Sequence, residues 1–141
     1  MRLVAVMVGG AAGALARWAV ELAVPSVQGF PLATFLINIS GAFGLGLVGV
    51  LLLERLPPTR YLRPLLGIGL LGAYTTFSTM AMEGVRLLDA GRVGLAVGYW
   101  VATLLVGQMA GVWGMWLGRL RWTGRRDAPE RREQTAADQH R

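Results

Sequence analysis

The chain has 141 residues, 54% of them hydrophobic and 16% charged, with a mean hydropathy of +0.49. Ordinary soluble domains carry about 25% charged residues. The composition therefore excludes an ordinary soluble domain and indicates a membrane protein. With no cysteine and one histidine, the chain is neither a disulfide scaffold nor a zinc site built on those residues. The net charge is +6, but residues 119–141 account for +3 of it, so no nucleic-acid-binding face and no nucleic-acid partner are expected.

Four apolar runs are long enough to cross a membrane, which takes about 20 predominantly apolar residues. They cover residues 3–24, 32–53, 62–82 and 93–118. Prolines, glycines and charges lie between the runs, and such residues commonly separate helices. We therefore predict an all-α membrane domain of four transmembrane helices over residues 1–118. Residues 119–141 are predicted to form a basic, disordered tail.

The first run contains a charged pair. Glu21 follows Arg17 at i+4, the spacing of a helical ion pair. An ionisable residue inside a membrane is also a functional candidate, so Arg17 could instead face a vestibule and attract anions. The beginning of the run, up to residues 14–16, imitates a secretory signal peptide, but hydrophobicity resumes directly at Trp18.

The second run carries Asn38 near its centre, with Phe35 and Phe43 on either side. A buried asparagine can link two helices, or its amide can donate hydrogen bonds to a dehydrated anion. A phenylalanine usually packs, but the positive edge of its ring can also solvate a small anion. Both interpretations stay open for these residues.

The third run contains a cluster of hydroxyls at its middle, directly after three glycines. The hydroxyls belong to Thr75, Thr76, Ser78 and Thr79. One threonine in a membrane helix can bond back to its own helix without functional meaning. Four of them predict a helix that breaks at mid-membrane, where irregular backbone survives only inside protein or beside a cavity. Such a break frees carbonyl oxygens for a cation and amide or hydroxyl donors for an anion.

The fourth run has a modest polar track, because Tyr99, Thr103 and Gly107 fall on one helical face. Glu83, which closes the third run, is interpreted as an interface residue rather than a proton carrier. Four tryptophans suit anchoring at the membrane interface: Trp100, Trp113, Trp116 and Trp122. Nothing resembles a nucleophile, a metal-ligand cluster or a phosphate loop, so no enzymatic activity is predicted.

Glycines spaced four residues apart predict close contacts between helices. The pairs are Gly9/Gly13, Gly94/Gly98, Gly107/Gly111 and Gly114/Gly118. Packing within one protomer accounts for some of them. Four short helices enclose little volume, however, so we expect a homo-oligomer rather than a pathway inside one protomer.

Arginines suggest an orientation. An even number of spans puts both termini on one side, and eight arginines lie near helix ends there against three on the other side. The positive-inside rule therefore favours cytoplasmic termini.

Three strings together carry a resemblance to a known family. They are GGAAGALARW at residues 9–18, NISGAF at residues 38–43 and GLLGAYTTFST at residues 69–79. In this order they resemble the Fluc/CrcB family of fluoride channels, over all four runs but not the tail. The resemblance implies an antiparallel, dual-topology homodimer in the cell membrane that passively exports fluoride through two pores along the dimer interface. It also implies a central structural sodium ion that is not transported.

The resemblance further implies roles for individual residues. The main-chain carbonyls of Gly72 and Thr75 would bind the sodium ion. The pore and vestibule positions of the family fall at Arg17, Asn38, Phe77, Glu83, Tyr99 and Thr103. The predicted anion pathway adds four residues to these: Phe35, Phe43, Ser78 and Thr79.

The chain departs from the family pattern in three ways. Met80 stands where a second phenylalanine is usual, so one ring contact is missing, and Ala33 replaces a common glycine. The arginine imbalance conflicts with insertion in both directions. Either the bias is overridden, or this chain has a fixed orientation and pairs with an oppositely oriented homologue.

Two other classes of protein compete with a channel. A proton-coupled small multidrug exporter also has four short helices, but it needs a carboxylate deep in the first span. Glu21 lies near the end of that span and is paired with Arg17. A non-transporting or chromosome-associated membrane protein would depend on the basic tail alone.

Overall fold

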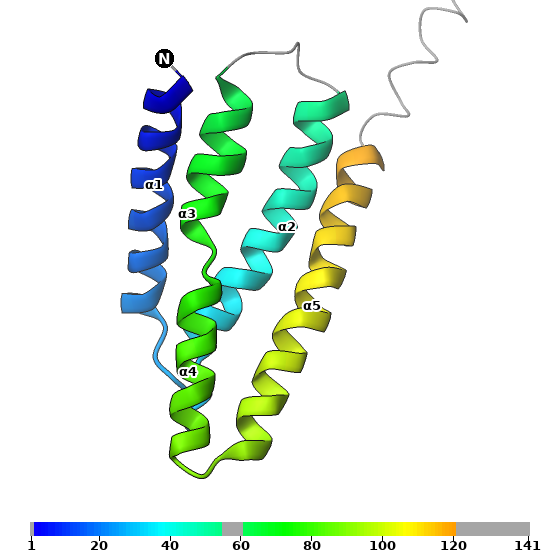
Figure 1. Ribbon diagram of the computed structural model, residues 1–141. Helices are drawn as coiled ribbons and strands as arrows, with labels where there is room; N and C mark the ends of the chain where they lie inside the picture. Colours follow the sequence, from blue (N-terminus) through cyan, green and yellow to red (C-terminus); the bar gives the residue numbers. More distant parts are fainter. Residues whose placement is uncertain (1, 55–60, 121–141) are drawn as a thin grey trace, which may run out of the picture.

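The computed structural model describes residues 2–54 and 61–120. Its elements are α1 (Arg2–Ala23), α2 (Leu32–Glu54), the π-helix η1 (Arg63–Leu71), α3 (Gly72–Tyr74), α4 (Phe77–Asp89) and α5 (Val93–Leu120). They form four columns that run up and down, the third being η1, α3 and α4 in succession (Figure 1). All four columns are long and apolar enough to cross a membrane. The predicted all-α, multi-pass membrane protein is thus confirmed.

The predicted bounds of the third and fourth helices are too short. The third helix does not give way to a connection at Glu83 but continues to Asp89. It can do so because the Glu83 carboxylate accepts two hydrogen bonds inside the protein and needs no exposed loop. The fourth helix continues to Leu120, so Arg119 stands in its last turn, where a cation suits the helix dipole. Residues 121–141 of the predicted tail lie outside the described residues.

The first and third columns touch backbone to backbone. A Cβ atom on Gly9 or on Gly13 would meet backbone atoms of Leu70. A Cβ atom on Gly69 would meet the backbone of α1 in turn. Since only glycine fits at these positions, the small residues set the distance between α1 and η1.

Columns α2 and α5 approach each other in the same way. A Cβ atom on Gly46 would meet the backbone of α5, and one on Gly114 would meet that of Phe43. By contrast, Gly94 and Gly98 have no atom within 4 Å of such a Cβ. Packing within the protomer therefore accounts for the Gly9/Gly13 and Gly114 contacts, while the Gly94/Gly98 pair faces open space.

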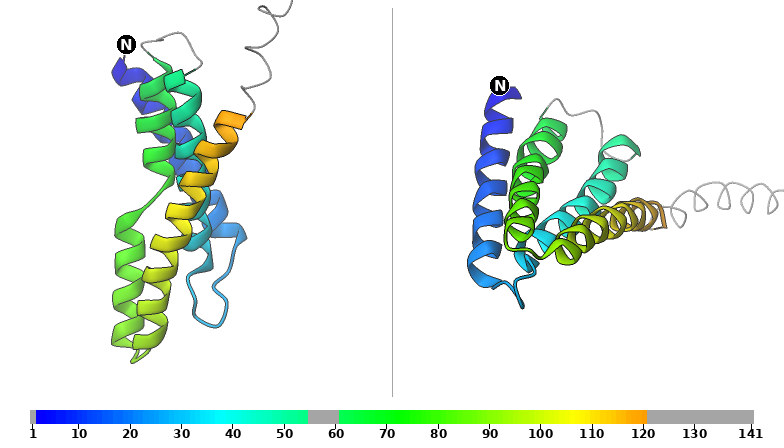
Figure 2. Two further views of the ribbon diagram at one scale, coloured as in Figure 1. Left: turned by 90° about the vertical axis from the view of Figure 1, so that its right-hand side faces the viewer. Right: turned by 60° about the horizontal axis from the view of Figure 1, so that its bottom comes forward.

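Helices α4 and α5 lie side by side (Figure 2, left view), and a cluster of buried side chains lies between them. The buried cluster there consists of Met80, Leu87, Ala96 and Tyr99. Trp100 packs against this cluster and its Nε1 donates to the Met80 carbonyl at 3.2 Å. The indole N–H of Trp100 thus helps to hold α4 against α5, and anchoring of this residue at the membrane interface stays a prediction.

Candidate functional site

The third column is interrupted between α3 and α4. Thr75 has φ −76° and ψ 154°, and Thr76 has φ −146° and ψ 119°. Both residues are extended, whereas helical residues have ψ near −42°. The chain consequently runs straight for a short stretch between two helices (Figure 2). The carbonyl end of one helix and the N–H end of the next meet at this stretch.

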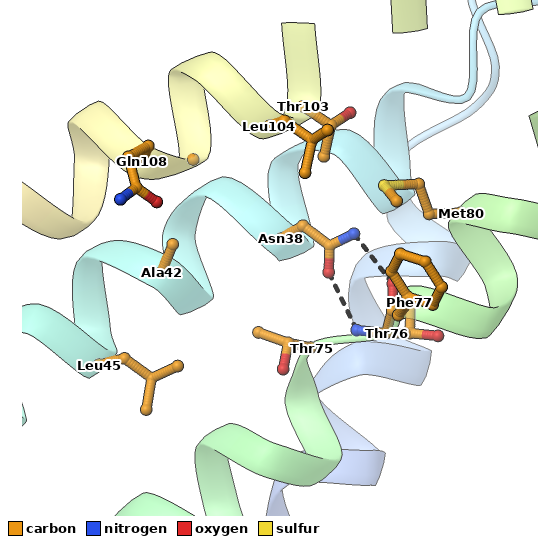
Figure 3. Close-up of a pocket in the computed structure, with 11 residues that line it drawn as sticks. Asn38, Ala42, Leu45, Thr75, Thr76, Phe77, Met80, Thr103, Leu104 and Gln108 are labelled. Atoms are coloured by element: carbon orange, nitrogen blue, oxygen red, sulfur yellow. Dashed lines mark hydrogen bonds between the residues drawn. The ribbon is translucent and has the colours of Figure 1, made fainter. Parts of the chain in front are cut away.

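Asn38 of α2 binds both backbone groups of Thr76. Its Nδ2 donates to the Thr76 carbonyl at 3.0 Å, and its Oδ1 accepts from the Thr76 N–H at 2.9 Å (Figure 3). Paired bonds of this kind hold extended backbone as a neighbouring strand would. An asparagine Nδ2 carries two N–H groups, so the amide has a second donor besides the one on Thr76.

Thr76 also caps the helix that follows it. Its Oγ1 accepts from the Thr79 N–H at 3.1 Å and donates to the Thr79 Oγ1 at 2.9 Å. This is the hydrogen bonding of an N-cap, which stabilises the first turn of α4. Ser78 Oγ lies 3.4 Å from the same Thr76 oxygen. The hydroxyls of Thr76, Ser78 and Thr79 thus lie at the start of α4, whereas Thr75 Oγ1 donates back to the Leu71 carbonyl at 2.9 Å.

Two carbonyls at the interruption lose their usual helical partners. In a continuous α-helix the Gly72 carbonyl accepts from the Thr76 N–H, and the Thr75 carbonyl accepts from the Thr79 N–H. Here the Thr76 N–H donates to Asn38, and the Thr79 N–H donates to the Thr76 side chain. The diversion of these two N–H groups affects the same two carbonyls that the family resemblance assigns to a cation.

A hollow of about 320 Å³ opens beside the interruption (Figure 3). Its polar lining comes from Asn38, Thr75, Thr76, Thr103 and Gln108. Phe77 and Met80 line it from α4, and Phe77 is 75% exposed in the protomer. Gln108 was not predicted, although it directly follows Gly107, the last residue of the polar track, and is a polar side chain in an apolar helix.

A second hollow, of about 440 Å³, lies toward the α1–α2 connection. It brings together Arg17, Glu21, Thr79 and Glu83, which come from two different columns. Arg17 Nε lies 3.8 Å from Glu21 Oε1, and both side chains are about one-third exposed. The i+4 pair thus forms at the wall of this hollow, so Arg17 both pairs with Glu21 and faces the opening.

Glu83 is the most strongly bound charge in this second hollow. Thr34 Oγ1 donates to its Oε1 at 2.9 Å, and the Tyr99 hydroxyl donates to its Oε2 at 2.8 Å. Thr34 is 1% exposed and was not predicted, since nothing in the sequence pairs it with a residue 49 positions away. Thr79 lines this hollow and bonds Thr76 of the first one, so hydroxyls connect the two hollows along α4.

Of the other predicted pathway residues, Thr103 lines a hollow, whereas Phe35 and Phe43 do not. Thr103 lines the first hollow and donates to the Tyr99 carbonyl at 2.7 Å. Phe35 packs edge-on against Phe30, with 5.5 Å between ring centroids, and Phe43 contacts Gly114 of α5. Neither Phe35 nor Phe43 is among the described residues that line the two hollows.

Comparisons with known proteins cover most of the chain. Residues 4–115 match the family described as "CrcB-like protein, Camphor Resistance (CrcB)". The "Fluoride-specific ion channel FluC 1" of Mycobacterium tuberculosis is 49% identical over 109 residues, 77% of this chain and 83% of that protein. The "Fluoride-specific ion channel FluC" of Methanopyrus kandleri is 42% identical over 125 residues, 87% and 93% of the two chains. The protein of the same name from Hydrogenobaculum is 40% identical over 121 residues, 85% and 99% of the two chains. The matched segment reaches all four helical columns, and the chain belongs to the CrcB family.

Proposed function

We propose that this protein is a fluoride-selective channel that lets fluoride leave the cytoplasm passively and so relieves fluoride toxicity. The observation that carries the proposal is the extended Thr75–Thr76 backbone held by Asn38 beside a polar-lined hollow. The names of the relatives, which are fluoride-specific ion channels, point to the same ion.

The donors at the interruption suit a small, strongly hydrated anion. A dry path must replace the water around fluoride with N–H and O–H groups. Asn38 supplies its second amide N–H, the Ser78 and Thr79 hydroxyls of α4 supply O–H groups, and Phe77 offers a ring edge. Thr103 lines the hollow, but its own O–H donates to the Tyr99 carbonyl. These donors are spread along the two hollows rather than gathered in a closed cage. Spread donors favour both uptake and release, as conduction requires.

We also propose that the interruption lies at mid-membrane and holds a resident sodium ion that is not transported. The carbonyls of Gly72 and Thr75 would hold it, since their helical N–H partners are diverted to side chains. When bound, the ion supplies a fixed positive charge that offsets the cost of bringing anions into a low-dielectric region. Two oxygens are too few for a hard cation, so a second protomer would complete the shell.

The partner in this proposal is a second copy in antiparallel orientation, or an oppositely oriented homologue, in the cell membrane. Gly72 is exposed and Phe77 is 75% exposed in the protomer. A partner placed against the interruption would cover both. Among the described residues, Arg2, Arg63 and Arg119 lie at the end that holds the N-terminus and the end of α5 (Figure 1), which supports a cytoplasmic location of that end in at least one protomer.

The alternative, a proton-coupled multidrug exporter, is not favoured. Its essential carboxylate would have to be Glu21, which lies near the end of α1 and pairs with Arg17 at 3.8 Å. The relatives are named as channels rather than exporters.

Efflux from liposomes tests the proposed function. Vesicles loaded with potassium fluoride or potassium chloride and containing the purified protein receive a potassium ionophore, and an ion-selective electrode follows the released anion. We expect fluoride release without chloride release, and equal chloride release would overturn the proposal. Phe77→Ile should suppress the fluoride flux while the protein stays folded. Leu104→Val, which changes an apolar residue of the same hollow, is the matched control and should conduct.

A further inference from the structure

The connection between α1 and α2 contains a tight turn at residues 27–30. The Val27 N–H donates to the Phe30 carbonyl at 3.2 Å, and the Phe30 N–H donates back to the Val27 carbonyl at 2.8 Å. The central residues, Gln28 and Gly29, have φ of 52° and 81°. Two successive positive φ angles are the mark of a type I′ turn. Gln28 has a side chain that disfavours this conformation, so the surroundings must hold the turn in place.

Arg92, from the connection between α4 and α5, is the group that holds this turn. Its Nη2 donates to the Gln28 carbonyl at 2.6 Å. Its guanidinium lies directly over Gly29, where a Cβ atom would meet Nη1. The Arg92 N–H in turn donates to the Leu87 carbonyl at 2.8 Å, which fixes the base of the side chain. One arginine therefore ties the α1–α2 connection to the end of α4.

The turn is linked by packing to the second hollow. Phe30, its last residue, places its ring edge-on against Tyr99, with 5.4 Å between centroids and 85° between planes. Tyr99 donates to Glu83 at 2.8 Å. Ser26, directly before the turn, lines the same hollow as Glu83. A shift of the turn would therefore move Ser26 in the wall of the hollow. It would also move the Phe30 ring, which packs against Tyr99, the donor to Glu83.

We propose that Arg92 is a positioning residue for conduction. By holding the Gln28–Gly29 turn, it fixes the wall of the second hollow at Ser26 and keeps the Phe30 ring against Tyr99. Its effect on flux rests on the proposed function, since it presumes that ions reach the interruption through this hollow. The effect on the shape of the hollow does not depend on that function.

Arg86 provides a matched comparison. It lies near the same end of the molecule and carries the same charge, and its guanidinium contacts Met82 Sδ of its own helix at 3.6 Å. If arginines at this end acted only by attracting anions, neutralising either one would slow conduction alike. If Arg92 acts through the turn, the two variants will differ.

The test uses Arg92→Gln, Arg86→Gln and Gly29→Ala in the full chain, with two measurements for each variant. The first is fluoride efflux from liposomes. The second is the labelling rate of Ser26→Cys by a neutral thiol reagent, which responds to access and not to the lost charge, and which meets no other thiol because the chain has no cysteine. For Arg92→Gln we expect at least about a tenfold change in both rates, the scale of one lost charge-assisted hydrogen bond. Arg86→Gln should leave both rates near those of the parent protein.

Gly29→Ala disturbs the turn in a second way, because its methyl group would displace the guanidinium and a φ of 81° disfavours alanine in any case. It should therefore alter the labelling of Ser26→Cys, as Arg92→Gln does. If Arg92→Gln lowers expression, Arg92→Lys, which keeps the charge but loses the planar fork, takes its place and should still alter the labelling.

The outcomes separate the two hypotheses. Equal loss of flux in both arginine variants with unchanged labelling would overturn the positioning role. If Arg92→Gln alters the labelling, the positioning role is upheld. If the parent protein itself releases no fluoride, the proposed channel is contradicted, whatever the labelling shows.

Discussion

The two halves of the third column are held in contrasting ways. Before the interruption, the backbone of η1 lies against the backbone of α1 at glycines such as Gly9. After it, α4 is held by side-chain hydrogen bonds from its neighbours, among them those of Asn38, Tyr99 and Trp100. The two hollows lie along this second half. Close backbone packing thus fixes the position of η1. Hydrogen-bonded side chains hold α4, where polar groups face the two hollows.

The largest expected effect comes from breaking the backbone contact between α1 and η1. Gly9→Ala would place a methyl group against the backbone of Leu65 and Leu70, whereas Gly10→Ala meets nothing within 4 Å. We expect Gly9→Ala to destabilise the protein by more than about 3 kcal/mol, above ordinary overpacking, because the methyl group would meet backbone that cannot rotate away. Gly10→Ala should have almost no effect. The thermal stability of both variants is measured as the temperature at which the folded peak in size-exclusion chromatography is half lost. Equal tolerance of the two substitutions would contradict the role given to close backbone contact.

The next effect comes from the clamp at the interruption. Asn38→Leu leaves both backbone groups of Thr76 without their side-chain partner, at about 1–3 kcal/mol for each buried polar group. We expect the fluoride efflux rate to fall at least about tenfold. Gln108→Leu removes an amide from the same hollow but leaves the Thr76 bonds in place, so it should have a smaller effect. Similar losses in the two variants would mean that polarity of the hollow matters and the clamp does not.

A smaller effect is expected from the cap of α4. Thr76→Val removes the acceptor of the Thr79 N–H, a loss of about 1 kcal/mol for an N-cap. The freed N–H can then return to the Thr75 carbonyl, so sodium should bind about fivefold more weakly, while Thr76→Ser should bind it normally. The measurement is the sodium concentration that gives half of the rise in thermal stability. A parent protein whose stability does not respond to sodium would refute the sodium site.

The smallest effect is expected at Glu83, which has two donors. Tyr99→Phe and Thr34→Val each remove one of them, so each should cost about 1 kcal/mol of stability. Loss of both should cost more than the sum, because the carboxylate is then left without either donor. A double-mutant cycle on the midpoint of thermal unfolding tests this, and simple additivity would show that the two hydroxyls act independently.

The sequence was informative where the relevant property runs along the chain. Span length and polarity predicted four helices, and Asn38 and the hydroxyl cluster stood out because they interrupt apolar runs. The partner of Asn38 could not be predicted, since Thr76 lies on another column and only packing brings the two together. The same holds for Thr34 with Glu83, and it explains why the end of the third helix was misplaced: the charge that signals a loop is bound inside the protein. The π-helix η1, which lies against α1, has no signal in the apolar pattern of the third run.

The central claim is that the interrupted column conducts fluoride in preference to chloride, and a reversal potential tests it most directly. The purified protein is placed in a planar bilayer, first with a fluoride gradient and equal chloride on both sides, then with the two anions exchanged. We expect a reversal potential at the fluoride equilibrium potential in the first case and at zero in the second. A reversal potential that follows the chloride gradient would contradict it.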